Sequence, residues 1–373
     1  MERLIDNAQE IRESLAAGMT LPASWYSDAD MIRLEQEAIF KRSWQYAGPA
    51  ERVAEPGDWF TCYAGTIPIV VTRDKSGTVN AFVNVCRHRG HVVASGTGHR
   101  ASLQCPYHAW TYELDGTLRK APRSEREEGF DADAFSLLPV QIDALGPLLF
   151  VNPDIEASAL ADALGPLPEH FEAAGLDLDR LRFRVRREWE IAADWKIAVE
   201  NYLECYHCPV AHPGFSKVID VDPDAYLLSS DGLVSSQFGT PRASILSGNG
   251  EPPYDPHGDV KQAQYHLLWP NTTINIEFGP GNLSIDATRP DGPGRSRGAT
   301  DYFYYEEVPD DTAQAMMQFG IQVGNEDAAL VESVQAGLNT GMVPQGRLLL
   351  SSEHLIQHFQ KLVFDALTRS DMT

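Results

Sequence analysis

The chain has 373 residues, of which 43% are hydrophobic and 22% charged, a composition typical of a globular protein with one large or two smaller domains. Its formal net charge of -23 argues against nucleic acid and anionic membranes as partners, because both repel an acidic surface. No apolar run reaches membrane-spanning length, and the N-terminus lacks the apolar core of a signal peptide, so we expect a cytoplasmic protein. The odd number of cysteines, five, argues against a disulfide framework.

Three segments with different patterns follow one another along the chain. Residues 1–44 end in a predicted helix, and residues 45–152 carry short β-branched runs separated by turn residues, which indicate antiparallel strands. Residues 153–373 mix strand patterns, such as 182–191, with a long helical pattern over 311–338. We therefore expect a β-rich domain between an N-terminal helical segment and a larger mixed domain.

Two short strings of cysteine and histidine occur in the strand-rich segment. The string C-R-H begins at Cys86 and ends at His88, and C-P-Y-H begins at Cys105 and ends at His108. Each follows a predicted strand. Two thiolates and two imidazoles can bind one zinc ion, or a [2Fe-2S] cluster with cysteine on one iron and histidine on the other. The C-x-H spacing is uncommon in zinc sites, which favours the cluster.

A second group of metal-binding side chains lies in the stretch 200–212, which reads E-N-Y-L-E-C-Y-H-C-P-V-A-H. The pattern predicts a helix over 195–206 that ends shortly before Pro209, because the residue before a proline is disfavoured in a helix. His207 at the helix end and His212 in the following loop can then converge. Imidazole with carboxylate is the ligand set of non-haem iron, so one Asp or Glu must come from elsewhere.

Both strings match one known family. C-R-H-R-G-H and C-P-Y-H-A-W-T-Y, followed by L-D-G, resemble the Rieske motif of Rieske non-haem iron oxygenase catalytic subunits, and N-Y-x-E-C-Y-H-x4-H resembles their mononuclear iron motif. The resemblance implies that Cys86 and Cys105 ligate one cluster iron and that His88 and His108 ligate the other. It also implies an α+β fold, with a β-rich Rieske [2Fe-2S] domain and a helix-grip catalytic domain whose antiparallel sheet surrounds a long helix.

The resemblance also suggests the missing ligand. The family supplies its third iron ligand from the region that here reads N-E-D-A-A-L-V, so we expect Asp327 to complete a mononuclear Fe(II) site with His207 and His212. Glu326 is the neighbouring alternative.

Further implications concern electron supply. In this family a carboxylate bridges His108 of one subunit to an iron-ligating histidine of the next in a homotrimer, and Glu204 holds that place. Electrons would come from NAD(P)H through a separate flavin and [2Fe-2S] reductase, with O2 as cosubstrate. Most members carry aspartate at the bridge. Glutamate in the string E-C-Y-H-C resembles the branch that acts on quaternary ammonium compounds such as glycine betaine, carnitine and proline betaine.

Aromatic faces recognise a small quaternary ammonium cation, which accepts no hydrogen bonds. The aromatic candidates are Tyr202, Tyr206, Tyr265, Trp269, Phe278, Tyr302 and Tyr304. The expected reaction is hydroxylation of a C–H beside the nitrogen, which gives N-demethylation for betaine-type substrates and C–N cleavage for carnitine-type substrates. The alternatives are oxidation of an aromatic substrate, and a non-catalytic electron carrier or zinc-stabilised binding module.

Three other features carry further expectations. His354 and His358, four residues apart on a predicted helix, are a rival metal-binding pair. Cys205 and Cys208 are expected to be small packing residues beside the iron. Residues 213–263 are rich in Gly, Pro, Ser and Asp with few periodic signals, so we expect an irregular lid or entrance.

Overall fold

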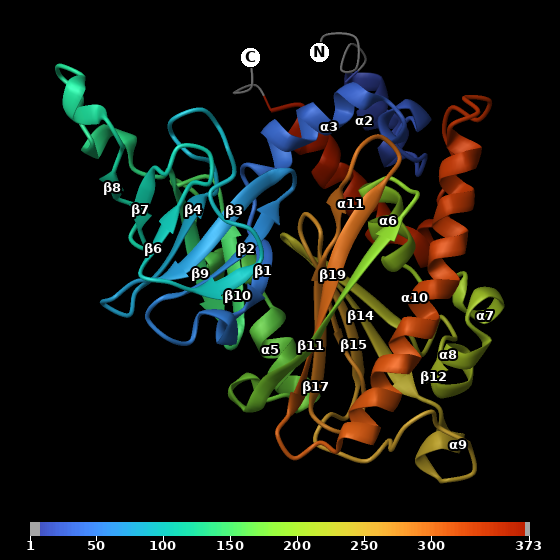
Figure 1. Cartoon of the computed structure of the whole chain (residues 1–373). Helices are drawn as coiled ribbons and strands as arrows, with labels where there is room; N and C mark the ends of the chain where they lie inside the picture. The colour runs from blue at the N-terminus through green and yellow to red at the C-terminus, as the bar shows by residue number, and fades with distance from the viewer. Residues whose placement is uncertain (1–7, 370–373) are drawn as a thin grey trace. The chain divides into compact units, whose positions relative to one another are not determined.

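The computed structural model describes residues 8–369, which form two compact units (Figure 1). The inserted unit is the continuous stretch Phe40–Leu160, and the split unit combines the chain up to Ile39 with the chain from Ala161 onward. The two cysteine–histidine strings lie in the inserted unit, and the stretch 200–212 lies in the split unit. Within 8–369, no helix is both long and apolar enough to cross a lipid bilayer.

The inserted unit contains two antiparallel sheets among its described residues. The larger has the strand order β1-β10-β9-β4-β3-β2-β5 and the smaller has the order β6-β7-β8. β-Branched and aromatic side chains such as Phe60, Ile69 and Val71 are fully buried in its core. The strands are β1 (Gln45–Pro49), β2 (Asp58–Ala64), β3 (Ile67–Arg73), β4 (Val79–Val83), β5 (Thr97–His99), β6 (Ser102–Gln104), β7 (Thr111–Glu113), β8 (Leu118–Lys120), β9 (Pro139–Leu145) and β10 (Leu148–Asn152).

The turn between β7 and β8 requires a glycine. The Asp115 carboxylate accepts a hydrogen bond from the Thr117 N–H at 3.0 Å, which closes the turn. Gly116 has a φ of +85°, and a Cβ placed on it would lie 2.4 Å from the Phe82 ring. Only glycine satisfies both constraints, so the hairpin is fixed at this position.

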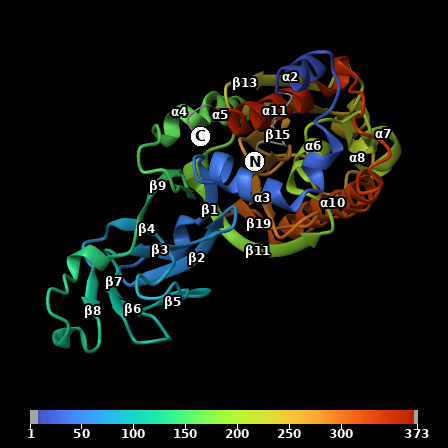
Figure 2. The same cartoon turned by 90° about the horizontal axis from the view of Figure 1, so that it is seen from above.

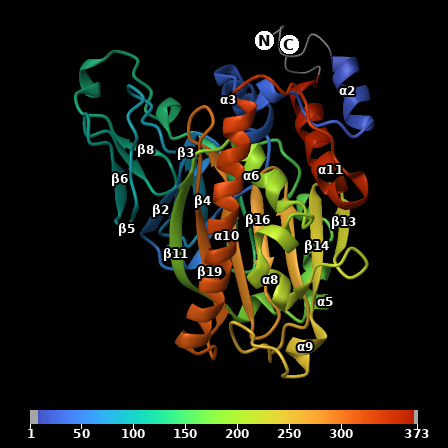
Figure 3. The same ribbon diagram turned by 90° about the vertical axis from the view of Figure 1, so that its right-hand side faces the viewer.

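The split unit is built on one large antiparallel sheet. Among the described residues its strand order is β11-β19-β17-β16-β15-β14-β12, with β13 beside β14 and β18 beside β19. Figure 3 shows the long helix α10 (Asp310–Leu338) running along one face of the sheet. The strands are β11 (Leu181–Ile191), β12 (Ile219–Asp220), β13 (Leu227–Asp231), β14 (Val234–Pro241), β15 (Ala263–Leu268), β16 (Thr272–Ile276), β17 (Asn282–Ala287), β18 (Arg289–Pro290) and β19 (Ser296–Tyr305). The other helices are α2 (Ala8–Ala16), α3 (Ala29–Glu35), α4 (Leu160–Leu164), α5 (Leu167–Ala174), α6 (Trp195–Tyr202), α7 (Cys208–Ala211), α8 (Pro213–Val218), α9 (Ala243–Leu246) and α11 (Leu350–Leu367).

Buried charges tie the N-terminal helices to the rest of the split unit. Helices α2, α3 and α11 lie over one end of the sheet (Figures 1 and 2). The Lys196 ammonium on α6 is fully buried, donates to Glu35 on α3, and lies 2.7 Å from Asp194 Oδ1. Burial alone would lower the pKa of Lys196, but Asp194 and Glu35 raise it to about 12. Such a buried cation is tolerated because carboxylates surround it, so α3 and α6 are fixed together.

The strand predicted over 182–191 and the helix predicted over 311–338 are confirmed as β11 and α10. Two other expectations are wrong. The helix predicted over 195–206 ends at Tyr202. The segment 213–263, expected to be irregular, contains α8, α9 and strands β12 to β14. Strand β14 reads V-S-S-Q-F-G-T-P and is buried along most of its length. Because several of its buried residues are polar, the sequence lacks the alternation of apolar and polar residues that predicts a strand.

Candidate metal centres and substrate cavity

Two loops of the inserted unit hold the cysteine–histidine strings in matching conformations. In each loop the cysteine carbonyl accepts from an N–H four residues later, and the cysteine N–H donates to a carbonyl five residues later. The bonds are Gly90 N–H to Cys86 O and Ala109 N–H to Cys105 O, both 3.0 Å, and Cys86 N–H to His91 O and Cys105 N–H to Trp110 O, both 2.8 Å. Two cysteines are therefore presented by loops of the same form.

The four side chains differ sharply in exposure. Cys86 and Cys105 are 3% and 2% exposed, whereas His88 and His108 are exposed with ring centroids 4.6 Å apart. Two buried thiols beneath two neighbouring imidazoles fit a [2Fe-2S] cluster that has one inner, cysteine-ligated iron and one outer, histidine-ligated iron.

A second set of ligand atoms converges in the split unit. His207 Nε2 lies 3.0 Å from His212 Nε2 and 3.4 Å from Asp327 Oδ1, and His212 Nε2 lies 2.9 Å from the same oxygen. One ligand atom from each residue lies within 4.8 Å of the other two. Two imidazole nitrogens and one carboxylate oxygen in this arrangement fit a non-haem iron with open positions.

Each histidine is oriented by a carboxylate on its other nitrogen. His207 Nδ1 donates to Glu204 Oε1, and His212 Nδ1 donates to Glu326 Oε2 at 2.7 Å. These bonds leave both Nε2 atoms to face Asp327, as in the carboxylate–histidine–metal arrangement of many metalloenzymes. Glu326 therefore contacts His212 on the side away from the candidate metal site, whereas Asp327 lies where the two Nε2 atoms meet.

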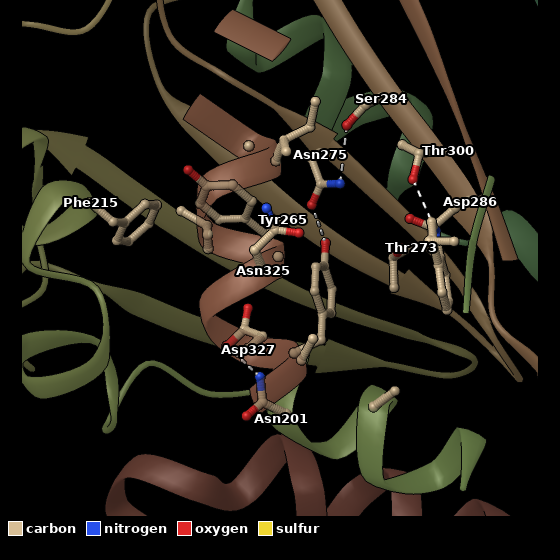
Figure 4. A pocket seen from close by; sticks show the side chains of 18 of the residues that line it. Asn201, Phe215, Tyr265, Thr273, Asn275, Ser284, Asp286, Thr300, Asn325 and Asp327 are labelled. Atoms are coloured by element: carbon tan, nitrogen blue, oxygen red, sulfur yellow. Dashed lines mark hydrogen bonds between the residues drawn. The ribbon is translucent and has the colours of Figure 1, made fainter. Parts of the chain in front are cut away.

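Hydrogen bonds also fix Asp327 and set the charges of the triad. The Asn201 amide donates to Asp327 Oδ1 at 2.7 Å (Figure 4). Burial alone would raise the pKa of Asp327, but hydrogen bonds from His207 and His212 lower it to about 2. Burial alone would lower the pKa of His207, but hydrogen bonds to Asp327 and Glu204 raise it to about 9. The pocket formed by these three side chains thus stabilises positive charge.

Two short helices, rather than one long one, place the histidines. After α6 ends at Tyr202, the chain turns and α7 begins at Cys208, with His207 at its N-terminal cap and Pro209 in its first turn. Proline is favoured in the first turn of a helix, where its missing N–H costs nothing. Pro209 therefore begins a helix, in contrast to the expectation that it ends one, and a single turn of α7 brings His212 back beside His207.

The expectation that Cys205 and Cys208 are separate packing residues is wrong. They form a disulfide with a Cα–Cα distance of 4.9 Å. The Cys208 N–H donates to the Cys205 carbonyl at 3.2 Å, so the turn after α6 brings the two side chains together. The disulfide closes the turn that carries His207 and that directly follows Glu204.

A cavity of about 520 Å³ adjoins the triad and lies between the sheet, α6 and α10. Four of the aromatic candidates line it, Tyr202, Tyr265, Tyr302 and Tyr304, and Figure 4 shows Tyr265 beside the helix that carries Asp327. The other candidates lie elsewhere. Tyr206 is 61% exposed, Trp269 is buried against Phe359 with ring centroids 5.6 Å apart, and Phe278 packs on Tyr254.

Strand register explains why the cavity has a polar wall. One row of paired residues crosses five strands and lines the cavity: Gln237, Tyr265, Asn275, Ser284 and Tyr302. Two carboxylates that also line it, Glu277 and Asp286, were not among the sequence candidates. The alternation I-N-I-E at Ile274 to Glu277 was the available signal, since both isoleucines are fully buried and the polar residue after each of them lines the cavity.

The rival pair on α11 gains no support. His358 Nε2 contacts the Gly232 carbonyl at 3.1 Å. Among the residues that the structure describes, His207, His212 and Asp327 form the one group of three or more potential ligands close enough to share an ion.

Comparisons with known proteins agree with this geometry. The family description "Ring hydroxylating alpha subunit (catalytic domain)" matches residues 178–369, and "Rieske [2Fe-2S] domain" matches residues 43–140. Carnitine monooxygenase oxygenase subunit of Acinetobacter pittii is 34% identical over 355 residues, which cover 92% of this chain and 94% of the relative. Choline monooxygenase, chloroplastic, of Spinacia oleracea is 32% identical over 349 residues, which cover 91% of this chain and 76% of the relative.

Solved structures give the same result. The quaternary ammonium Rieske monooxygenase CntA in complex with its substrate L-carnitine has a TM-score of 0.81 at 30% identity, covering 96% of this chain and 99% of that one. Naphthalene 1,2-dioxygenase from Rhodococcus sp. has a TM-score of 0.84 at 18% identity, covering 98% of both chains, and shows the fold alone. The expected α+β architecture is confirmed, with a β-rich Rieske domain and a catalytic domain. The chain therefore belongs to the family of Rieske non-haem iron oxygenase alpha subunits.

Proposed function

We propose that this chain is the oxygenase component of a two-component monooxygenase that hydroxylates a C–H beside the nitrogen of a quaternary ammonium compound. The observation that carries the proposal is the cavity at the triad, whose walls present the rings of Tyr202, Tyr265, Tyr302 and Tyr304. Aromatic faces attract an alkylated ammonium ion through the ring quadrupole. The names of relatives that act on carnitine and choline support the same substrate class.

In this proposal residues 45–152 hold the cluster, and residues 153–373 with the N-terminal segment 1–44 hold the iron. Cys86, Cys105, His88 and His108 ligate the cluster. The matching loops support this assignment, because they bury both sulfurs and expose both imidazoles.

His207, His212 and Asp327 ligate the mononuclear iron in this proposal. The iron, when bound, supplies open coordination positions for dioxygen activation, and the cluster supplies electrons. Glu204 and Glu326 hold the two histidines in the tautomer that directs Nε2 toward the site. Asn201 fixes the carboxylate of Asp327.

Electrons reach the site through a neighbouring subunit in this proposal. The chain assembles as a homotrimer, and Glu204 connects His207 to His108 of the partner subunit. A separate flavin and [2Fe-2S] reductase delivers electrons from NAD(P)H. In support, the Glu204 carboxylate already accepts a hydrogen bond from His207, and the His108 ring is exposed.

The Tyr112 hydroxyl should tune the cluster. It accepts a hydrogen bond from the Arg87 N–H at 3.0 Å and lies 3.3 Å from Cys86 Sγ, so it donates to the ligating sulfur. Removing such a bond concentrates negative charge on the sulfur and stabilises the oxidised cluster. We expect Tyr112→Phe to lower the cluster potential by about 40 mV, the equivalent of about 1 kcal/mol for one electron. Redox titration followed by visible absorption measures this shift, and an unchanged potential would contradict the assignment of Cys86.

Coupled turnover tests the proposed reaction. Purified, iron-loaded enzyme is supplied with a compatible reductase, NADH and oxygen, and glycine betaine, proline betaine, choline and carnitine are compared. Hydroxylation of an N-methyl group gives a hemiaminal that collapses to formaldehyde and a tertiary amine, whereas attack on the carnitine chain releases trimethylamine. Formaldehyde or trimethylamine that depends on substrate supports the proposal. Oxidation of an aromatic compound with no product from any quaternary ammonium compound would refute it.

A further inference from the structure

Two carboxylates flank the tyrosine-bearing row of the cavity wall. Glu277 lies two residues beyond Asn275 of the row, and Asp286 lies two residues beyond Ser284 on the next strand. Because β16 and β17 are antiparallel, these two positions are on opposite sides of the row, each about 7 Å along its strand. Figure 4 shows Asn275, Ser284 and Asp286 on this wall. A ligand above the row is therefore placed between two acidic groups.

Neither carboxylate has a cationic partner within the described chain. Glu277 accepts hydrogen bonds from Tyr265 Oη at 3.1 Å and Tyr254 Oη at 3.5 Å. Thr273 and Thr300 lie near Asp286 and act to lower its pKa. Burial nevertheless raises the pKa of each carboxyl to about 7. Both groups thus remain ready to be stabilised by positive charge from a ligand.

The cavity offers little to a negatively charged group. Among its described lining residues, Arg187 is the single lysine or arginine, and its side chain is exposed on β11. A betaine carries a carboxylate as well as an ammonium group, and buried anions need a paired cation or several donors. In this cavity that carboxylate would meet Glu277 and Asp286, and charges of like sign repel strongly where water is scarce.

We propose that the cavity selects a quaternary ammonium cation that carries no carboxylate, and that Glu277 and Asp286 set this preference over zwitterionic betaines. The inference rests on the proposed function and narrows its substrate class. The tyrosine rings contact the alkyl groups of the cation, and the two carboxylates stabilise its charge from either side.

Matched substrates isolate the charge from the shape. Glycine betaine is compared with glycine betaine amide, and γ-butyrobetaine with its amide, because each pair shares one skeleton and differs by a carboxylate. KM and equilibrium Kd are measured on the iron-loaded enzyme. We expect each amide, and choline, to bind at least about 10-fold more tightly than the corresponding zwitterion, a difference that one favourable charge contact supplies. Tighter binding of the zwitterions would overturn the inference.

Isosteric variants assign the preference to these two residues. Glu277→Gln and Asp286→Asn keep the shape and should each reduce the amide-to-carboxylate ratio by about 3-fold to 10-fold. Asp231→Asn makes the same chemical change on exposed strand β13 and should leave the ratio unchanged. Ratios that stay at the wild-type value in both cavity variants would overturn the inference.

The pH dependence gives a second readout on the unmodified enzyme. Affinity for the amides, whose charge is permanent, should rise up to about 10-fold between about pH 6 and pH 8 as Glu277 and Asp286 ionise. The tyrosines near the two carboxylates have raised pKa values and stay neutral in this range. They are Tyr202, Tyr226, Tyr254, Tyr265 and Tyr304 near Glu277, and Tyr202 and Tyr302 near Asp286. Asp301 is near Asp286, but the charge of Asp301 is paired with Arg186. An affinity that does not change with pH would contradict the assignment.

Failure of this inference differs from failure of the proposed function. If zwitterions react and the amides and choline do not, the reaction class stands and the charge preference is wrong. If no quaternary ammonium compound reacts while an aromatic compound is oxidised, both are wrong.

Discussion

Replacing Asp327 with asparagine should remove the mononuclear iron and lower turnover by more than about 100-fold. Asp327 Oδ1 is within hydrogen-bonding distance of His212 Nε2 and is held by Asn201. A neutral amide oxygen offers the iron a weaker ligand and cancels none of its charge. Elemental analysis should show one iron fewer per chain, while the visible absorption of the cluster should remain.

Glu326→Gln is the matched control for this change. Glu326 also carries a carboxylate and is the next residue on α10, but it reaches His212 only through Nδ1. Loss of an outer partner of this kind typically costs about 10-fold to 100-fold in metal affinity. We therefore expect Glu326→Gln to retain iron at concentrations where Asp327→Asn does not. The opposite order would identify Glu326 as the ligand.

Replacing Glu204 with glutamine should separate cluster reduction from substrate oxidation. The reductase should still reduce the cluster, because the inserted unit is unchanged. Reoxidation of the cluster in the presence of substrate and oxygen should slow by about 10-fold to 100-fold, because the proposed charged bridge from His207 to the neighbouring subunit is lost. Stopped-flow absorption of the prereduced enzyme measures this step in a single turnover.

Two controls distinguish loss of electron transfer in Glu204→Gln from loss of the iron. Iron content must stay near the wild-type level, since Glu204 also orients His207. Glu204→Asp keeps the charge with a shorter reach, and we expect a rate between those of the wild type and Glu204→Gln. Unchanged reoxidation in Glu204→Gln would show that electrons follow another route.

The proposed cluster ligands, with His207 and His212, could be singled out from the sequence because their spacing is local and their chemistry is specific, whereas Asp327 followed from the family resemblance. Cysteine and histidine within three or four residues leave few alternatives. The strand at 182–191 and the helix at 311–338 were also predictable, because strong periodicity persists over many residues.

Other features depend on contacts that no local pattern records. A period of two along I-N-I-E shows that Glu277 points away from the buried isoleucines, but it cannot distinguish a face in water from a face in a cavity. The Cys205–Cys208 disulfide depends on α6 ending at Tyr202. Five cysteines are compatible with one disulfide and three cysteines outside it. Those three are Cys62, Cys86 and Cys105.

The insertion of one unit within the other has a consequence for biosynthesis. The inserted unit is a continuous stretch, so it can fold as soon as Leu160 has left the ribosome. Glu35 cannot form its ion pair until Lys196, 161 residues later in the chain, has been synthesised. This delay corresponds to roughly 10 to 30 s of translation. Asp327 follows later still. We therefore expect the cluster site to be complete in the nascent chain while the iron site is still lacking a ligand.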